Sequence, residues 1–145
     1  TPRGIISDTF ETSITWERFE EFHTDVKQAT LAAIREVTGK EGAVSCRFSH
    51  AYADGPAPYF GFHAQGRAGC LLEQWQAIKD IASDAVLAGG GTITHHHAVG
   101  RDHQKWYEQQ RPALFGDLLR ACKQRLDPLT VLNPGVLVPE DLTPQ

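Results

Sequence analysis

Apolar residues recur at steps of three and four in three segments of the chain, the spacing of one face of an amphipathic helix. The first stripe consists of Trp16, Phe19, Phe22, Val26, Ala33 and Val37. The second consists of Leu71, Trp75, Ile78, Ala82 and Ala85, and the third of Phe115, Leu118, Leu119, Cys122 and Leu126. Glycines follow the first two stripes, and prolines 112 and 128 bracket the third, as expected at helix ends. The pattern therefore predicts three helices.

Between the first two helices the pattern changes to strict alternation. Apolar and polar side chains alternate over residues 44–49 and again over 59–63, with the turn dipeptide Asp54-Gly55 between them. This predicts a hairpin in which Tyr59 and His63 face away from the phenylalanines between them. Pro56 and Pro58 restrict the start of the second strand to a sheet edge or a bulge.

A short strand is predicted over residues 92–94, after the second helix. The resulting order of helix, hairpin, helix, strand and helix indicates an α+β fold, with helices packed on a mostly antiparallel sheet. The Pro-rich segment 127–145 is expected to run as an extended C-terminal tail.

Composition narrows the function classes. The chain has 145 residues, 41% of them hydrophobic, which suits a compact domain with a core. A net charge of −4 without a basic run argues against nucleic acid as a partner. No apolar stretch approaches the roughly 20 residues that span a bilayer. The three cysteines lack CxxC spacing, so we expect buried, reduced thiols in a cytoplasmic protein.

Three consecutive histidines, His95, His96 and His97, follow three glycines and are the main candidates for chemistry. Histidine exchanges a proton near neutral pH more readily than other side chains, and a glycine turn permits close backbone approach. If the segment is extended, His95 and His97 point one way and His96 the other. The pattern fits an active-site edge as well as a solvated, partly hydrogen-bonded loop.

The same histidines raise the question of a metal site. His95 and His97 have the right chemistry to bind a metal ion together with His50 or His103. Adjacent histidines that alternate faces chelate poorly, and no acidic residue stands at a diagnostic spacing. We therefore expect no metal.

Four segments resemble one family. The stretches FETSITW, SHAYADGPAPYF, GGTITHHHAVGRDH and LDPLTVLNPGVL occur in this order in the C-terminal part of FAD-dependent alkyldihydroxyacetone-phosphate synthases, flavoproteins of the vanillyl-alcohol-oxidase type. The resemblance runs from about Ser7 to Leu137, and the histidine triplet is its most specific part. Related 2-hydroxyacid dehydrogenases carry a metal-binding glutamate where this chain has His96, which argues against a metal and a hydroxyacid substrate.

The resemblance implies an activity and roles for individual residues. Such synthases exchange the acyl group of acyl-dihydroxyacetone phosphate for a fatty alcohol, a step of ether-lipid synthesis without net oxidation. Tyr59 would be the proton donor and acceptor, with His95, His96 and His97 as catalytic residues beside the flavin. Thr9 would line the substrate site, and His96 and Asn133 would contact the cofactor.

The resemblance also implies what accompanies this chain. Residues 1–126 would be the substrate-binding cap portion and 127–145 the tail, while the FAD-binding domain, expected upstream, is absent from the sequence. We expect FAD bound mainly by that domain, a lipid-like substrate, a homodimer and contact with a membrane surface. The fragment alone is expected to be inactive. An FAD-linked oxidase or dehydrogenase of another alcohol or 2-hydroxyacid, and a non-catalytic binding module, remain as alternatives.

Overall fold

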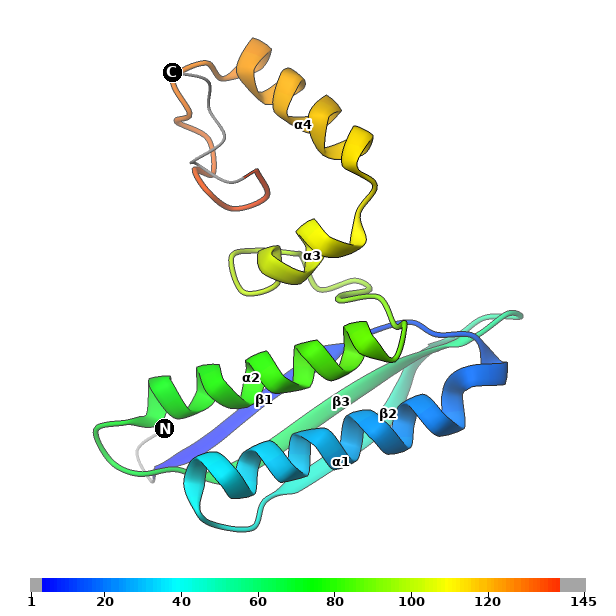
Figure 1. Cartoon of the computed structure of the whole chain (residues 1–145), viewed down its shortest axis with the longest axis vertical. Coiled ribbons are helices and arrows are strands. Elements are labelled where there is room, and N and C mark those ends of the chain that lie inside the picture. The colour runs from blue at the N-terminus through cyan, green and yellow to red at the C-terminus, as the bar shows by residue number, and fades with distance from the viewer. Residues whose placement is uncertain (1–3, 139–145) are drawn as a thin grey trace. The chain divides into compact units, whose positions relative to one another are not determined.

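The computed structural model describes residues 4–138, and the chain divides into two compact units between His97 and Ala98 (Figure 1). The first unit contains β1 (Ile5–Glu11), a 3-10 turn (Trp16–Arg18), α1 (Phe19–Thr38), β2 (Ala43–Ala51), β3 (Pro56–Gln65) and α2 (Leu71–Ala88). The second contains α3 (Gln104–Gln110) and α4 (Ala113–Leu126). This confirms the α+β class with helices packed on an antiparallel sheet.

The sheet has three strands in the order β1-β3-β2, and both pairings are antiparallel. The predicted hairpin forms β2 and β3, and Tyr52 N–H donates to the carbonyl of Gly55 at its turn. β3 is the central strand, so of the two predicted settings for its prolines, a sheet edge or a bulge, the structure shows the bulge. Its prolines are tolerated because the pairing with β2 shifts register between Phe48 and His50, and because Pro56 and Pro58 offer their carbonyls to Ile14 and Thr12.

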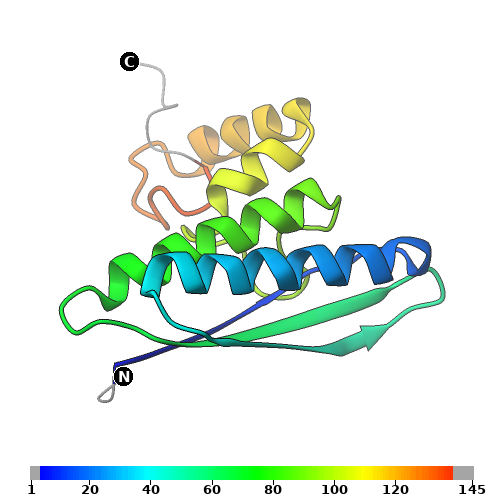
Figure 2. The same ribbon diagram turned by 60° about the horizontal axis from the view of Figure 1, so that its bottom comes forward.

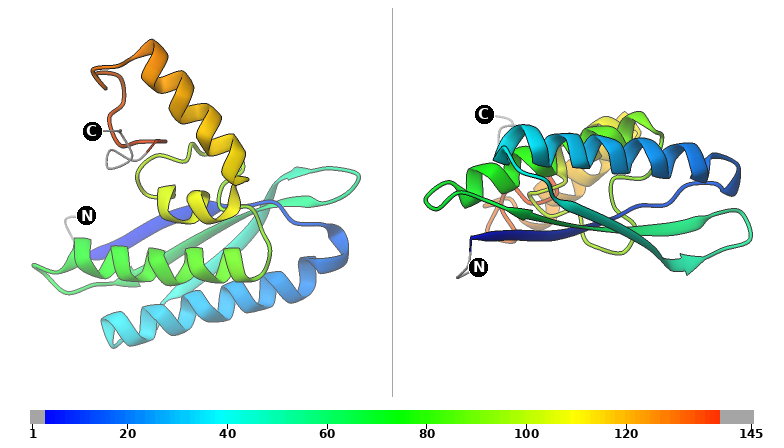
Figure 3. Two further views of the ribbon diagram at one scale, coloured as in Figure 1. Left: turned by 45° about the horizontal axis from the view of Figure 1, so that its top comes forward. Right: turned by 90° about the horizontal axis from the view of Figure 1, so that it is seen from below.

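Helices α1 and α2 lie side by side on one face of this sheet (Figures 2 and 3). The core between the two layers is apolar and includes Ile6, Phe10, Phe22, Val26, Ile34, Phe60, Phe62, Ile78, Ala82 and Val86. Each helix contributes the stripe that its sequence periodicity predicted, and alternate residues of β1 and β3 supply the rest. The other face of the sheet is left for polar side chains.

One ion pair is built into this packed layer. Lys79 of α2 is 4% exposed and its Nζ donates to Asp8 Oδ2 at 2.7 Å and to the carbonyl of Thr9 at 3.1 Å. Trp75 Nε1 donates to the same carboxylate oxygen at 2.9 Å. Burial raises the pKa of Asp8, but Lys79 and these hydrogen bonds outweigh it and hold the pKa below its usual range. The pair thereby fastens β1 to α2 immediately beside Thr9.

In the second unit, α4 begins after Pro112 and ends before Asp127, as predicted. Trp106 of α3 is buried, whereas Leu114, Leu118 and Leu126 of α4 are exposed. Among the described residues, no helix is both long and apolar enough to span a membrane. Residues 127–138 contain turns without helix or strand, and the rest of the expected tail lies outside the described residues.

The predicted secondary structure differs from the structure in two ways. Residues 92–94 do not form a strand, and the sequence pattern did not predict β1 or α3. The cysteines are free but not buried: Cys46 and Cys70 are partly buried and Cys122 is exposed. Burial is nevertheless sufficient to raise the pKa of Cys46 to about 11. The division into a cap over 1–126 and a tail over 127–145 concerns a whole enzyme and stays a prediction.

Candidate active site

The open face of the sheet carries the candidate site. Because side chains alternate along a strand, the residues that flank the buried Phe10, Phe60 and Phe62 point to this face. In register across the sheet, Glu11 lies opposite Tyr59, and Tyr59 lies opposite Arg47 on the other side. Tyr59 and His63 thus face away from the core, as predicted.

Tyr59 is held by contacts from three directions. Its hydroxyl donates to Thr9 Oγ1 at 3.1 Å, and the guanidinium of Arg47 lies 4.6 Å from the centre of its ring. The ring of His97 meets Tyr59 edge-on, with 5.4 Å between the centroids. A pocket of about 380 Å³ opens here, lined by Thr9, Ser45, Cys46, Arg47, Tyr59, Gly61 and His63. The structure therefore brings Thr9, Tyr59 and His97 together.

The triple glycine fixes where the histidine segment runs. A Cβ on Gly91 would stand 2.6 Å from Thr12 Oγ1 and 2.7 Å from two atoms of the Phe22 ring, so only glycine fits. Gly91 N–H donates to the carbonyl of Val86 and Thr92 N–H to that of Ser13, which joins the segment to the chain just beyond β1. The absence of a side chain at Gly91 thus lets the backbone run close against Thr12 and Phe22 on its way to Glu11.

Glu11 is the centre around which the triplet turns. Its side chain is fully buried at the end of β1, and its Oε1 accepts the backbone N–H groups of His95, His96 and His97. Nδ1 of His96 lies against Oε2 without hydrogen-bond geometry, and none of the described residues donates a hydrogen bond to that oxygen. The segment is therefore a turn wrapped around a carboxylate, and the prediction of an extended triplet was wrong.

The electrostatics of Glu11 follow from this arrangement. Burial raises the pKa of the carboxyl group, but the backbone N–H groups of His97 and His96 and the charges of their rings outweigh burial. The net effect holds the pKa of Glu11 below its usual range. The triplet therefore surrounds a carboxylate that stays ionised at neutral pH.

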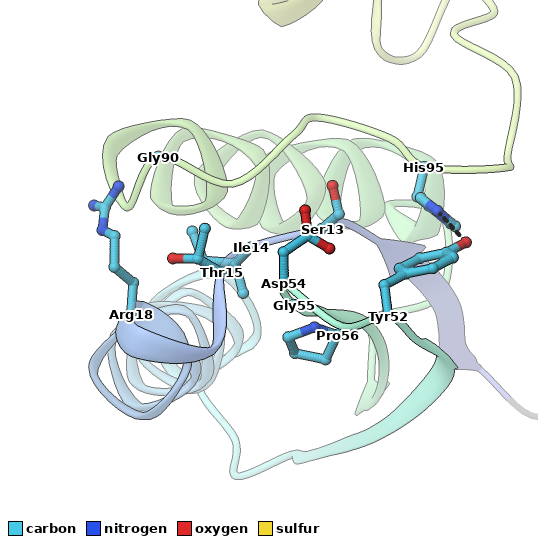
Figure 4. A pocket seen from close by; sticks show the side chains of 10 residues that line it. All are labelled: Ser13, Ile14, Thr15, Arg18, Tyr52, Asp54, Gly55, Pro56, Gly90 and His95. Carbon is cyan, nitrogen blue, oxygen red and sulfur yellow. Dashed lines mark hydrogen bonds between the residues drawn. The ribbon is translucent and has the colours of Figure 1, made fainter.

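The outer side of the triplet borders a second pocket. The hydroxyl of Tyr52 lies 3.1 Å from Nε2 of His95, a hydrogen bond visible in Figure 4. These two residues form one rim of a pocket of about 340 Å³, and Arg18, whose Nη2 donates to the carbonyl of Gly89, forms the other (Figure 4). The His50 ring stacks on Tyr52 and lies 5.2 Å from the rings of His95 and His96.

Two combinations of these side chains have ligand atoms close enough for a metal ion. One atom each of His50, His95 and His96 lie within 4.8 Å of one another, as do one atom each of Glu11, His96 and His97. The expected absence of a metal stays a prediction. His103, also considered as a ligand, belongs to the second unit, where its Nδ1 lies near the carbonyls of Ala98 and Val99.

Five of the six site residues predicted from the sequence lie in the first unit, around the end of β1: Thr9, Tyr59, His95, His96 and His97. Asn133 belongs to the second unit, where it adopts a positive φ of 45° and lines an apolar pocket of about 630 Å³. Its role at the cofactor stays a prediction. Sequence reasoning missed Glu11, although this residue stands in the FETSITW stretch that carries the family resemblance.

Comparison with known proteins identifies relatives of this chain. The chain is 33% identical over 139 residues to alkyldihydroxyacetonephosphate synthase of Caenorhabditis elegans, covering 93% of this chain and 23% of that protein. It is 26% identical over 132 residues to the synthase of the same name from Dictyostelium discoideum, covering 91% and 21%. The chain thus spans under a quarter of the length of these relatives.

A solved structure described as alkyldihydroxyacetonephosphate synthase superimposes with a TM-score of 0.63 at 19% identity, over 90% of this chain and 20% of that one. At this identity the likeness shows the fold. Residues 1–137 match the family described as FAD linked oxidases, C-terminal domain. Since this match covers nearly the whole chain, the protein belongs to the C-terminal domain family of the FAD-linked oxidases.

Proposed function

We propose that the chain is the substrate-facing part of an FAD-dependent enzyme that exchanges the acyl group of acyl-dihydroxyacetone phosphate for a fatty alcohol. The observation that carries this proposal is a pocket lined by Tyr59 and Thr9 in which the Tyr59 ring also contacts the ring of His97. These residues come from β3, β1 and the glycine-histidine segment, and the family resemblance implies a role in the site for each of them. The activity named for the relatives supports the same reaction.

The donors on this face fit a flavin by their chemistry. Hydroxyls and imidazoles such as those of Thr9, Tyr59 and His96 donate to and accept from carbonyl oxygens and ring nitrogens, the polar atoms of an isoalloxazine. The ring of His96 is 46% exposed and is the member of the triplet most accessible to such a group. When bound, FAD supplies the electron-pair chemistry that amino-acid side chains lack.

The chain's own residues then handle protons and position the substrate. Exchange of an acid for an alcohol at carbon requires a proton to be removed and returned, and a tyrosine hydroxyl that is oriented by a neighbour can do this. Thr9 accepts the hydroxyl hydrogen of Tyr59 and so fixes its direction. Arg47 and His97 restrict the ring from its face and its edge.

The test is an alkyl-exchange assay on the full-length enzyme that contains these residues. We expect Tyr59→Phe to lower kcat by about 100-fold or more, the usual size of a lost acid–base group, while the flavin spectrum and melting temperature stay unchanged. Tyr107→Phe, on α3 and outside the site, is the matched control and should retain wild-type rates. A wild-type rate in Tyr59→Phe would refute the proton role of Tyr59.

The same assay separates the alternatives. Oxidation of a simple alcohol or a 2-hydroxyacid with an added electron acceptor, without alkyl exchange, would replace the proposed reaction by an oxidase or dehydrogenase. Retention of fold and flavin without either activity would indicate a binding module.

A further inference from the structure

The strongest unassigned feature is the buried carboxylate of Glu11. Glu11 is 2% exposed and shares the open face of β1 with Thr9, whereas Asp8 faces α2 and Phe10 faces the core. Within residues 4–138 the hydrogen-bond donors to Glu11 all come from the histidine segment: the backbone N–H of His95 at 3.2 Å and those of His96 and His97 at closer range. A buried carboxylate is costly unless hydrogen-bonded, so this contact commits the segment to one conformation.

The second carboxylate oxygen determines where a proton must lie on His96. Nδ1 of His96 lies against Oε2, and Oε2 has no hydrogen-bond donor among the described residues. This contact lies off the line of a hydrogen bond, so it is electrostatic, and the negative charge beside Nδ1 favours a hydrogen on that nitrogen over a lone pair. The neutral ring of His96 therefore carries its hydrogen on Nδ1, and Nε2 has the free lone pair.

The neighbouring ring is consistent with this assignment. Nδ1 of His95 lies 3.2 Å from Nδ1 of His96, and only one of two such atoms can hold the hydrogen between them. If His96 holds it, His95 has its own hydrogen on Nε2 and donates to the Tyr52 hydroxyl 3.1 Å away. The ring nitrogens and the hydroxyl from Tyr52 to His96 Nδ1 then have complementary partners, while Oε2 of Glu11 has only the charge contact with His96.

We propose that Glu11 is the positioning residue of the histidine triplet: its carboxylate folds the segment and holds His96 as the Nδ1–H tautomer, which leaves Nε2 as the proton-accepting atom. This is the logic by which a buried carboxylate orients a catalytic imidazole through its other nitrogen. The tautomer stands on the contacts of this chain alone. The role of His96 Nε2 as the base of the triplet rests on the proposed function.

The direct test is the nitrogen-15 NMR spectrum of the histidine rings, recorded on this chain at a pH where they are neutral. We expect a protonated Nδ1 and an unprotonated Nε2 for His96 in the wild type. In Glu11→Gln the amide oxygen still accepts the three backbone hydrogens, but the amide nitrogen now donates to Nδ1. The variant should therefore keep the fold and reverse the tautomer of His96.

Asp8→Asn is the matched control, because it alters a carboxylate of the same strand that faces α2 and contacts Lys79. It should destabilise the chain and leave the His96 tautomer unchanged. If the wild-type ring carries its hydrogen on Nε2, or if Glu11→Gln leaves the tautomer as it was, the inference is wrong. If Glu11→Gln does not fold, the wild-type spectrum alone still decides.

An activity measurement then separates this inference from the proposed function. In the full-length enzyme we expect Glu11→Gln to lower kcat for alkyl exchange by about 100-fold with little change in KM, since the base is lost but the substrate pocket is not. A reversed tautomer with undiminished exchange would refute His96 as the base and leave the positioning role intact. An unreversed tautomer would refute the positioning role whatever the activity.

Discussion

At the scale of single residues, two carboxylates of β1 make stability depend on pH. The pKa values of Glu11 and Asp8 are both held below their usual range, so each stabilises the fold fully above its unfolded value of about 4. That stabilisation is lost as pH falls through the lower folded value. We expect Glu11→Gln to flatten the fall in unfolding free energy below about pH 5, measured by urea denaturation from pH 3 to 7.

The control for this pH dependence is Glu36→Gln, at an exposed position of α1, which should follow the wild-type profile. Asp8→Asn should remove the other part of the dependence by breaking the contact with Lys79. A Glu11→Gln profile parallel to the wild type would show that the carboxylate is not ionised in the folded state at neutral pH.

Some residues of the candidate site could be placed from the sequence and others could not. Tyr59 could be placed on the open face because strict alternation with Phe60 and Phe62 fixes its side of the strand. Glu11 could not be placed, because its partners are backbone groups 84 residues or more further along the chain and no local spacing encodes them. The chemistry of the triplet was therefore predicted, while the group that shapes it was not.

At the scale of elements, the glycine run connects α2 to the site and tolerates no side chain at Gly91. An added methyl group would overlap Thr12 and the buried ring of Phe22, an overpacking that costs about 1–3 kcal/mol. We expect Gly91→Ala to lower the unfolding free energy by that amount and to move the backbone amide NMR signals of His95, His96 and His97.

Gly39→Ala is the comparison for this element, since Gly39 ends α1 at a φ of 71° with no atom near its absent Cβ. It should also lower stability, through backbone strain, but leave the amide signals of the triplet in place. If both variants leave them in place, the glycine run does not position the histidines.

Helices were more predictable than strands for a physical reason. The apolar stripes of α1, α2 and α4 repeat over several helical turns. The period of 3.6 residues can therefore be recognised within each segment of the sequence. β1 was missed because its inward face includes Asp8, a charged residue whose partners are Lys79 and Trp75 of α2. Residues 92–94 resemble a strand in composition, but the contacts of Thr92 are with Ser13, beyond the end of β1, and not with a strand of the sheet.

At the scale of the whole molecule, the two units differ in how they are stabilised. The apolar core cluster lies entirely between Ile6 and Val86, within the first unit. Among the described residues of the second unit, Trp106 is the large apolar side chain that is buried, while several leucines of α4 are exposed. A segment of this size without its own core rarely folds alone.

This asymmetry predicts that the first unit is the cooperative folding unit. We expect a chain of residues 1–97 to unfold in one sharp thermal transition and to keep the amide NMR signals of α1, α2 and the sheet. Residues 98–145 alone should give the narrow amide dispersion of an unfolded chain, since burial of one tryptophan cannot offset the conformational entropy of ordering 48 residues. A broad transition for residues 1–97 would mean that the second unit completes the core, and the site on β1 and β3 would then depend on both units.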